Sequence, residues 1–233
     1  MIHQIIFASP TPGMSQTDFQ DYWLHVHAHQ YARHIPQIRR YLIDFRVPFD
    51  GLTNELPHAG AAEIWLANEQ EQLASLQSPM FLQGARMDEP RWAAFWATLV
   101  LDTRGQPMMD SPEYVASDRP IKLFVLLKRK PGMSLKQFRQ ESATQHAQRV
   151  MKLPGLQHYI QGHVLDSAYA IGESRFDAVE QWWFNDLEAL RRALASAQYV
   201  GEVAPGYEDL VEQKYLFKWV GQGHWVIGPD FRA

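Results

Sequence analysis

Residues 12–15 of the chain read Pro-Gly-Met-Ser, and residues 131–134 read Pro-Gly-Met-Ser again, 119 positions later. The dipeptide His27-Ala28 returns as His146-Ala147 at the same spacing. Self-similarity at a fixed spacing is the signature of an internal repeat. The sequence therefore predicts that one structural unit occurs twice in the chain.

The repeat continues downstream, with spacings that fall to 118 and then to 117. The matched residues are Tyr41 with Tyr159, Glu63 with Glu180, Trp65 with Trp182, Asn68 with Asn185, and Leu73 with Leu190. Between the two copies, residues 103–112 are rich in turn-forming residues and have no apolar period. We therefore predict a first module over residues 1–104, a linker over 105–119 and a second module over 120–233.

Both copies show the same succession of secondary-structure signals. Ser15 and Ser134 stand where N-cap hydroxyls begin helices, and Asn68 and Asn185 are the expected N-caps of second helices. Short runs rich in apolar, β-branched and aromatic residues predict the strands. The expected strands are 2–8, 41–47, 62–66 and 95–101 in the first copy, and 121–127, 159–165, 178–184 and 214–220 in the second. This order, β-α-β-β-α-β, is the ferredoxin-like motif.

A ferredoxin-like module carries two helices on one face of an antiparallel sheet and leaves the other face open. An open apolar face must be buried against another layer. We therefore predict an α+β protein in which two fused ferredoxin-like modules meet sheet to sheet and form an intramolecular dimeric α+β barrel. Concave apolar sites form in such spaces, so the pocket is expected inside the barrel or at its mouth.

The composition limits the classes of partner and site. The 233 residues are 46% hydrophobic and 21% charged, which is typical of a packed globular protein. The formal net charge is -4 without a run of like charge, so neither a nucleic-acid partner nor a polybasic membrane patch is expected. The absence of cysteine excludes disulfides and thiolate chemistry. Without a secretory signal or a membrane span, a cytoplasmic location is expected.

The first long helix carries three histidines at alternate positions. At 100° per residue, His25 and His29 fall on the outer side, away from the apolar stripe, and no carboxylate or thiol completes a metal site around them. His27 falls beside that stripe, and His146 is its counterpart in the second copy. An imidazole at the edge of a pocket suits proton transfer near neutral pH. The alternative is a histidine that only fixes the helix against the sheet, and the sequence leaves both interpretations open.

The expected third strands carry a Glu and a Trp two positions apart in each copy. Because side chains alternate along a strand, Glu63 and Trp65 share one face, as do Glu180 and Trp182. If that face lines the barrel interior, each carboxylate lies beside an aromatic wall and can act as a base or orient His27. If it packs against the helices, Trp65 belongs to the core and Glu63 to a salt bridge at its edge.

Two motifs resemble the EthD family. They are Lys130-Pro131-Gly132-Met133-Ser134 with Phe138, and Phe19-x-x-Tyr22-Trp23-x-x-x-His27-Ala28 followed by Ile38 and Tyr41. The second copy departs from the pattern with Glu141-Ser142 at the Tyr-Trp position, and the first copy has Gln37 where the second keeps Gly155. The resemblance implies a dimeric α+β barrel related to muconolactone isomerases, cofactor-free polyketide monooxygenases, polyketide cyclases and, more distantly, heme-binding barrels. It also implies that the histidine of the first helix, here His27 and its counterpart His146, is catalytic.

These observations lead to a hypothesis of a cofactor-independent enzyme of the lyase, isomerase or cyclase type. Its substrate is expected to be a small aromatic or polyketide-like compound, bound without a metal. The predicted catalytic residues are His27, Glu63 and His146, and the predicted substrate-binding residues are Tyr22, Trp23, Tyr41, Trp65, Tyr159, Glu180 and Trp182. The alternatives are a non-catalytic binding protein for an apolar metabolite, a cofactor-free monooxygenase and a heme-binding barrel. The sequence does not determine whether two such chains associate further as a homodimer.

Overall fold

The computed structural model describes residues 1–109, 119–170 and 172–232. Its strands are β1 (Ile2–Ala8), β2 (Arg40–Arg46), β3 (Gly60–Leu66), β4 (Leu99–Pro107), β5 (Ile121–Leu127), β6 (His158–Val164), β7 (Ala178–Phe184) and β8 (Phe217–Ile227). They form one closed antiparallel barrel in the order β1-β3-β2-β8-β5-β7-β6-β4. Two pairings join the halves, β2 with β8 and β4 with β6. The predicted fold class, two fused ferredoxin-like modules in an intramolecular α+β barrel, is confirmed.

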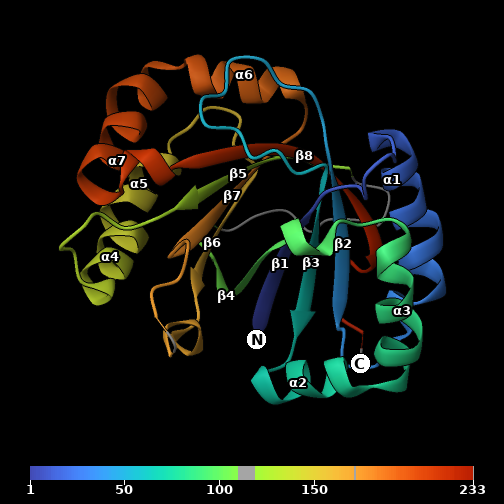
Figure 1. Ribbon diagram of the computed structural model, residues 1–233. Helices are drawn as coiled ribbons and strands as arrows, with labels where there is room; N and C mark the ends of the chain where they lie inside the picture. The colour runs from blue at the N-terminus through green and yellow to red at the C-terminus, as the bar shows by residue number, and fades with distance from the viewer. Residues whose placement is uncertain (110–118, 171, 233) are drawn as a thin grey trace.

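Each half carries a layer of helices on the outside of the barrel (Figure 1). The first layer contains α1 (Gln16–Tyr22), which continues as a π-helical segment Trp23–Ala28, then α2 (Glu69–Gln77), a π-helical segment Met80–Ala85, and α3 (Arg86–Asp88). The second contains α4 (Leu135–Glu141), a π-helical segment Ser142–His146, α5 (Ala147–Val150), α6 (Leu187–Ala195), a π-helical segment Tyr199–Val203, and α7 (Ala204–Leu210). Short 3₁₀ turns occupy Ala32–His34, Glu89–Arg91, Phe95–Ala97, Asp166–Tyr169 and Gln213–Tyr215. Within the described ranges, no helix has the length and apolar character that crossing a bilayer requires.

The helix starts follow the capping signals of the sequence at three of four positions. Ser15 and Ser134 accept hydrogen bonds from N–H groups three residues later, and Asn68 does the same for α2. The predicted cap Asn185 is wrong, because α6 is capped by Asp186, whose side chain accepts from the Ala189 N–H at 2.7 Å. Asp and Asn cap helices about equally well, so the adjacent pair could not be resolved by residue type alone.

Six strands lie within two residues of the predicted bounds, but the fourth strand of each half begins later than expected. Residues Phe95–Ala97 form a 3₁₀ turn, and β4 begins only at Leu99. At its other end β4 continues through Gly105 to Pro107, inside the predicted linker, because Gly105 and Pro107 pair with β6 across the junction of the halves. The remainder of that linker, 110–118, lies outside the described residues, and the module boundaries stay a prediction.

The strand register corrects one of the predicted matches between the copies. Ile5 of β1 lies opposite Glu63, and the equivalent residue of β5, Phe124, lies opposite Gln181. The structural counterpart of Glu63 is therefore Gln181, and Glu180 corresponds to Ala62. A shift of one residue moves a strand side chain to the other face of the sheet. Glu63 and Glu180 consequently point in opposite directions, one into the barrel and the other toward the helices.

A cluster of buried charged side chains lies inside the barrel. The Lys122 ammonium, fully buried, contacts the Glu63 carboxylate and donates to Asp44 Oδ2 at 3.3 Å. Glu63 Oε2 also accepts from Gln181 Nε2 at 2.7 Å and contacts His3 Nε2 at 2.6 Å. Burial alone would raise the pKa of Glu63, but Lys122 and His3 hold it below its ordinary value. Burial raises the pKa of Asp44 well above its ordinary range, against the pull of Lys122.

We predict that Lys122→Met destabilises the protein by about 3–5 kcal/mol, because it leaves the buried Glu63 carboxylate without its cation. Denaturant unfolding measures the change in free energy. Lys152→Met, at a lysine whose side chain is 64% exposed, is the matched control and is expected to stay within about 0.5 kcal/mol of the wild type. Equal stabilities of the two variants would contradict the structural role of the cluster.

Candidate functional site

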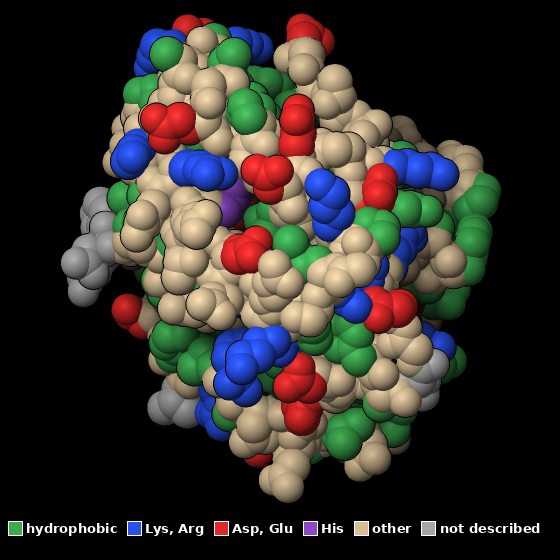
Figure 2. Space-filling view, turned by 90° about the vertical axis from the view of Figure 1, so that its left-hand side faces the viewer, with side chains coloured by type: hydrophobic (Ala, Val, Ile, Leu, Met, Phe, Trp, Pro, Cys, Tyr) green, Lys and Arg blue, Asp and Glu red, His purple; other side chains and the backbone are tan. Residues whose placement is uncertain are grey.

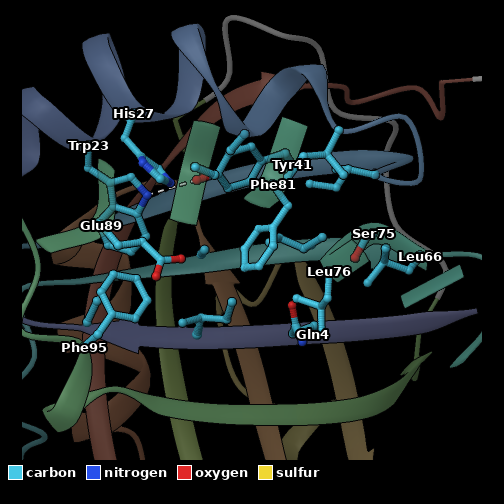
Figure 3. Close-up of a pocket in the computed structure, with 18 of the residues that line it drawn as sticks. Gln4, Trp23, His27, Tyr41, Leu66, Ser75, Leu76, Phe81, Glu89 and Phe95 are labelled. Atoms are coloured by element: carbon cyan, nitrogen blue, oxygen red, sulfur yellow. Dashed lines mark hydrogen bonds between the residues drawn. The ribbon is translucent and has the colours of Figure 1, made fainter. Parts of the chain in front are cut away.

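A cavity of about 110 Å³ lies in the first half, between the outer face of the sheet and a helical wall formed by α2 and the π-helical segments Trp23–Ala28 and Met80–Ala85. Its wall includes Gln4, Ala8, Trp23, His27, Ile35, Tyr41, Ala62, Leu66, Ser75, Leu76, Phe81, Ala85, Glu89, Trp92 and Phe95. Figure 3 shows His27, Trp23, Glu89 and Phe95 at one end, and Gln4, Leu66, Ser75 and Leu76 at the other. The sequence predicts a pocket inside the barrel or at its mouth, but this cavity lies on the other face of the sheet, because its strand residues point away from the interior.

The cavity exists because the first helical layer packs loosely on small strand residues. Ala8 and Ala62 offer little side-chain volume from the sheet. Above them, Leu73 and Leu76 of α2 remain 61% and 45% exposed instead of entering the core. A single water needs roughly 10–15 Å³ in the same measure of volume, so the cavity can hold a compact organic molecule.

His27 comes from the π-helical segment that continues α1 and is 6% exposed. Its Nδ1 lies 3.0 Å from the Oδ2 atom of Asp88, which is a residue of α3. Because a carboxylate only accepts hydrogen bonds, Nδ1 carries the proton and Nε2 holds the lone pair. Asp88 is itself fixed by Tyr22, whose hydroxyl donates to Oδ1 at 2.8 Å. The ring of Trp92 lies 4.7 Å from the imidazole, centre to centre.

Two titratable side chains of the cavity are perturbed in opposite directions. Burial lowers the pKa of His27, although the hydrogen bond to Asp88 partly offsets this. Burial raises the pKa of Glu89, and the neighbouring Arg86, whose Nη1 lies 2.9 Å from Glu89 Oε2, partly offsets that. The two pKa values therefore move toward each other. A histidine and a carboxylic acid whose pKa values are shifted toward each other are candidates for proton transfer.

Aromatic side chains form the wall of the cavity around His27. Trp23 Nε1 donates to the Tyr41 hydroxyl at 2.9 Å, a bond between the π-helical segment Trp23–Ala28 and β2 that Figure 3 marks. Trp92 packs between Trp23 and His27 and is 1% exposed. Its indole Nε1 is buried and has no hydrogen-bond partner in the described part of the chain. A buried donor without a partner is unusual in proteins.

The structure brings together only part of the predicted site. Trp23, His27 and Tyr41 line the cavity, and Tyr22 lies behind it as a partner of Asp88. The prediction that Glu63 orients His27 is wrong: Glu63 points into the barrel, and Asp88 holds the imidazole instead. Trp65 also faces the barrel interior, where it stacks on His3 at 4.3 Å.

The remaining predicted residues, all in the second half, lie in a solid core. Glu180 accepts from the hydroxyls of Tyr159 and Tyr207 at 2.8 and 2.6 Å. His146 Nε2 lies 3.3 Å from Glu180 Oε1 without the geometry of a hydrogen bond. Trp182 is fully buried in the same layer. This half has the histidine of the repeat but fills the space around it with side chains.

The chain positions show which residues of the second half take the places of Asp88 and Glu89. The elements α2 and α6, and likewise β4 and β8, begin 118 residues apart. By this spacing Asp88 and Glu89 correspond to Gly206 and Tyr207. Gly206 brings no carboxylate, although a Cβ there would lie 3.5 Å from His146 Nδ1. Tyr207 instead extends to Glu180, where the first half has Ala62.

The sequence analysis missed Asp88, Glu89 and Trp92. All three follow α2 in a stretch without a counterpart of the same residue type in the second copy, so the repeat gave no signal for them. The adjacent acids Asp88-Glu89 beside a tryptophan were the available clue. Among the described residues, no group of three histidine or acidic side chains could hold a metal ion. His25 is exposed and His29 is half-buried.

The family model of the EthD domain matches residues 11–95 and again residues 130–214. The chain belongs to the EthD family. It contains two EthD domains in tandem, in agreement with the repeat in the sequence. A comparison with curated proteins found no match.

Solved structures similar to this tandem EthD chain span its whole length. An anthrone oxidase-like protein has a TM-score of 0.65 at 10% identity, covering 100% of this chain and 95% of its own. A candidate monooxygenase from Fusobacterium nucleatum has a TM-score of 0.62 at 7% identity, covering 99% and 95%. A chlorite dismutase variant from Candidatus Nitrospira defluvii has a TM-score of 0.51 at 9% identity, covering 97% and 92%. At these identities the likeness shows a shared fold.

We predict that the His27 imidazole titrates below its ordinary pKa of 6.5, and that Asp88→Asn lowers this pKa further by removing the carboxylate that favours the charged ring. NMR titration of the ring protons measures both values. Because the folded pKa is depressed, the stability contributed by neutral His27 is present above pH 6.5 and declines as the pH falls toward the folded pKa. A folded pKa above 6.5 would contradict the geometry.

The difference in packing between the halves predicts opposite responses to added side-chain volume. Ala62→Leu extends into the cavity and is expected to change the free energy of unfolding by less than about 1 kcal/mol. Ala193→Leu, at a fully buried position of α6 in the second half, is expected to cost about 1–3 kcal/mol by overpacking. Thermal or denaturant unfolding compares the two variants. A larger loss for the Ala62 variant would show that the first layer is as tightly filled as the second.

Proposed function

We propose that the chain is a small-molecule enzyme that removes a proton from its substrate in the first-half cavity, with His27 as the general base. The observation that carries this proposal is the His27–Asp88 pair at the end of an apolar cavity. The expected substrate is a compact, largely apolar molecule with an acidic C–H or O–H group next to a carbonyl oxygen. Elimination, isomerisation and cyclisation each begin with this proton transfer. The structure of the substrate therefore decides which of these reactions follows.

Asp88 is the positioning residue of this proposal. Its carboxylate accepts the Nδ1 proton, fixes the tautomer and stabilises the imidazolium that forms when Nε2 takes a proton from the substrate. Tyr22 holds the carboxylate from the far side. The burial of His27 keeps the ring neutral before the reaction, which is the form that a base requires.

Two further cavity residues suit the charge that develops on the substrate. The unpartnered Nε1 donor of Trp92 can hydrogen-bond an enolate or phenolate oxygen as it becomes negative. The His27 imidazolium returns its proton to the product, and Glu89, whose pKa is raised by burial, is a second group of the cavity that can carry a proton. The aromatic wall of Trp23 and Phe95 excludes water and strengthens these interactions.

A cofactor-free oxygenase is the second candidate. Two solved structures that share the fold over the full length are named as an anthrone oxidase-like protein and a candidate monooxygenase. The same deprotonation by His27 would prepare an electron-rich substrate anion that O₂ oxidises. The two candidates differ in a single measurable quantity, the consumption of O₂ during turnover.

The surroundings of His27 and His146 do not fit a heme group. A porphyrin plate is much larger than a cavity of about 110 Å³, and Trp92 packs against the His27 ring where the plate would have to lie. His146 is 2% exposed and enclosed by Tyr207 and Glu180. Neither histidine has open space for an iron-bound macrocycle.

We predict that the wild type catalyses exchange of the acidic C–H protons of 2-tetralone, an enolisable aromatic ketone, in D₂O. His27→Ala should lower the exchange rate by about 10²–10⁴-fold, since it removes the base. Trp92→Phe should lower kcat by about 10²-fold with a smaller change in KM, since it removes an oxyanion donor. Proton NMR follows the loss of the C–H signal, and an oxygen electrode in parallel tests the oxygenase candidate.

His29→Ala is the matched control, because His29 lies on the same helix and faces away from the cavity. It is expected to exchange the ketone at the wild-type rate. Circular dichroism establishes that each variant is folded. If folded His27→Ala retained wild-type exchange, or if no member of a panel of enolisable ketones and phenols exchanged faster than in buffer, the cavity would be a binding site without this chemistry.

A further inference from the structure

A second pocket, of about 180 Å³, lies where the two halves meet on the outside of the barrel. It is formed by β4 and β6, which pair across the junction, and by α4 above them. Its charged and titratable residues are Arg104, Arg139, His163 and Asp166. The cavity around His27 shares none of these residues.

Arg104 contributes a guanidinium that the protein itself does not use. It stands on the outer face of β4 opposite His163, and its side chain has no hydrogen bond or ion pair in the described part of the chain. An arginine guanidinium presents five N–H donors in a plane that matches a carboxylate or phosphate group. Its placement at a concave wall leaves all five available to a ligand.

Arg139 reaches the same pocket from α4 and is held in place. Its Nη2 donates to the Val164 carbonyl at 2.6 Å, and its Nη1 contacts Asp166 Oδ1 at 2.7 Å. Its Nε is buried and has no partner among the described residues. Asp166 is 84% exposed, and so exposed an ion pair contributes little to stability. An incoming anion can therefore replace Asp166 at Arg139 with little loss.

His163 forms the polar floor between the two arginines. Its Nε2 lies 2.8 Å from Ser142 Oγ, which fixes the ring. Burial and the neighbouring Arg139 lower the pKa of His163 to about 4. The ring is consequently neutral near pH 7, and the positive charge of the pocket comes from the arginines.

The equivalent positions at the other junction are neutral. By the 118- and 119-residue spacings, Gln222 of β8 stands for Arg104, Gln20 of α1 for Arg139 and Phe45 of β2 for His163. Gln20 there donates to backbone carbonyls of the first half. The two arginines are therefore not a requirement of the barrel junction, which the same fold builds with neutral residues.

We propose that this pocket binds a small oxyanion, a carboxylate or a phosphate group, between Arg104 and Arg139. Asp166 turns out to solvent, and Arg104 and the Nη1 of Arg139 that Asp166 leaves donate to the oxygens of the anion. This site is separate from the His27 cavity, and its occupation does not depend on the function proposed for that cavity.

The test is a titration of the full chain with inorganic phosphate and, separately, with acetate, at constant ionic strength set by chloride. Isothermal titration calorimetry gives the affinity, and the shift in Tm gives the stabilisation. The variant Arg104→Gln/Arg139→Gln introduces the residues that the other junction carries. The variant Arg191→Gln/Arg192→Gln, on the surface of α6, removes the same charge elsewhere.

Saturable binding by the wild type and the α6 variant, weakened at least tenfold in the Arg104/Arg139 variant, supports the proposal. Preference for phosphate over acetate identifies a phosphate ligand, and equal binding identifies any small oxyanion. Since Arg139 also holds the Val164 carbonyl, Arg104→Gln alone serves if the double variant unfolds. Equal affinity in Arg104→Gln and wild type, or a wild-type response that chloride reproduces, overturns the proposal.

Discussion

Closure of the barrel is the constraint on which the rest of the structure depends. The pairings of β2 with β8 and of β4 with β6 leave no free strand edge, so every strand has one face inside the barrel and one face outside it. Lys122, Glu63 and Asp44 are sealed inside, where they must satisfy one another. The residues available for chemistry are those of the other face, and they meet the helices. A site between sheet and helices is thus a result of how the barrel closes.

Local signals made most of the architecture predictable from the sequence. The repeated Pro-Gly-Met-Ser turn, the serine N-caps and six strands were found because each depends on neighbouring residues. The match of Glu63 with Glu180 failed because the letters Glu-x-Trp align at 117, while the strand pairing fixes 118. Trp182 and Trp183 are adjacent, so either could be taken as the partner of Trp65. Only hydrogen bonds to the next strand decide such a register.

The candidate site was predictable to the extent that it lies on the first helix. His27, Trp23 and Tyr41 follow from helical periodicity and from the family motif, and the structure places all three at one cavity. Asp88 and Trp92 approach them from another part of the chain, through packing that no local pattern encodes. The cavity itself depends on how closely α2 packs on the sheet. That packing depends on side-chain volume at equivalent positions, such as Ala62 in the first half and Glu180 in the second. The roles proposed for these residues rest on geometry and not on the repeat.

The two halves share a backbone but differ in how completely their helical layers are filled. In a symmetric pair of separate chains, a side chain such as Tyr207 would enter both layers at once, and no hollow would remain. Because the two halves are fused in one chain, their sequences can differ, and one helical layer can be filled while the other keeps its cavity. The filled half can supply rigidity for the whole molecule, so that the open half is free to change the shape and chemistry of its hollow without a loss of folding. Divergence of ligand preference within such tandem proteins should therefore accumulate on one side of the molecule.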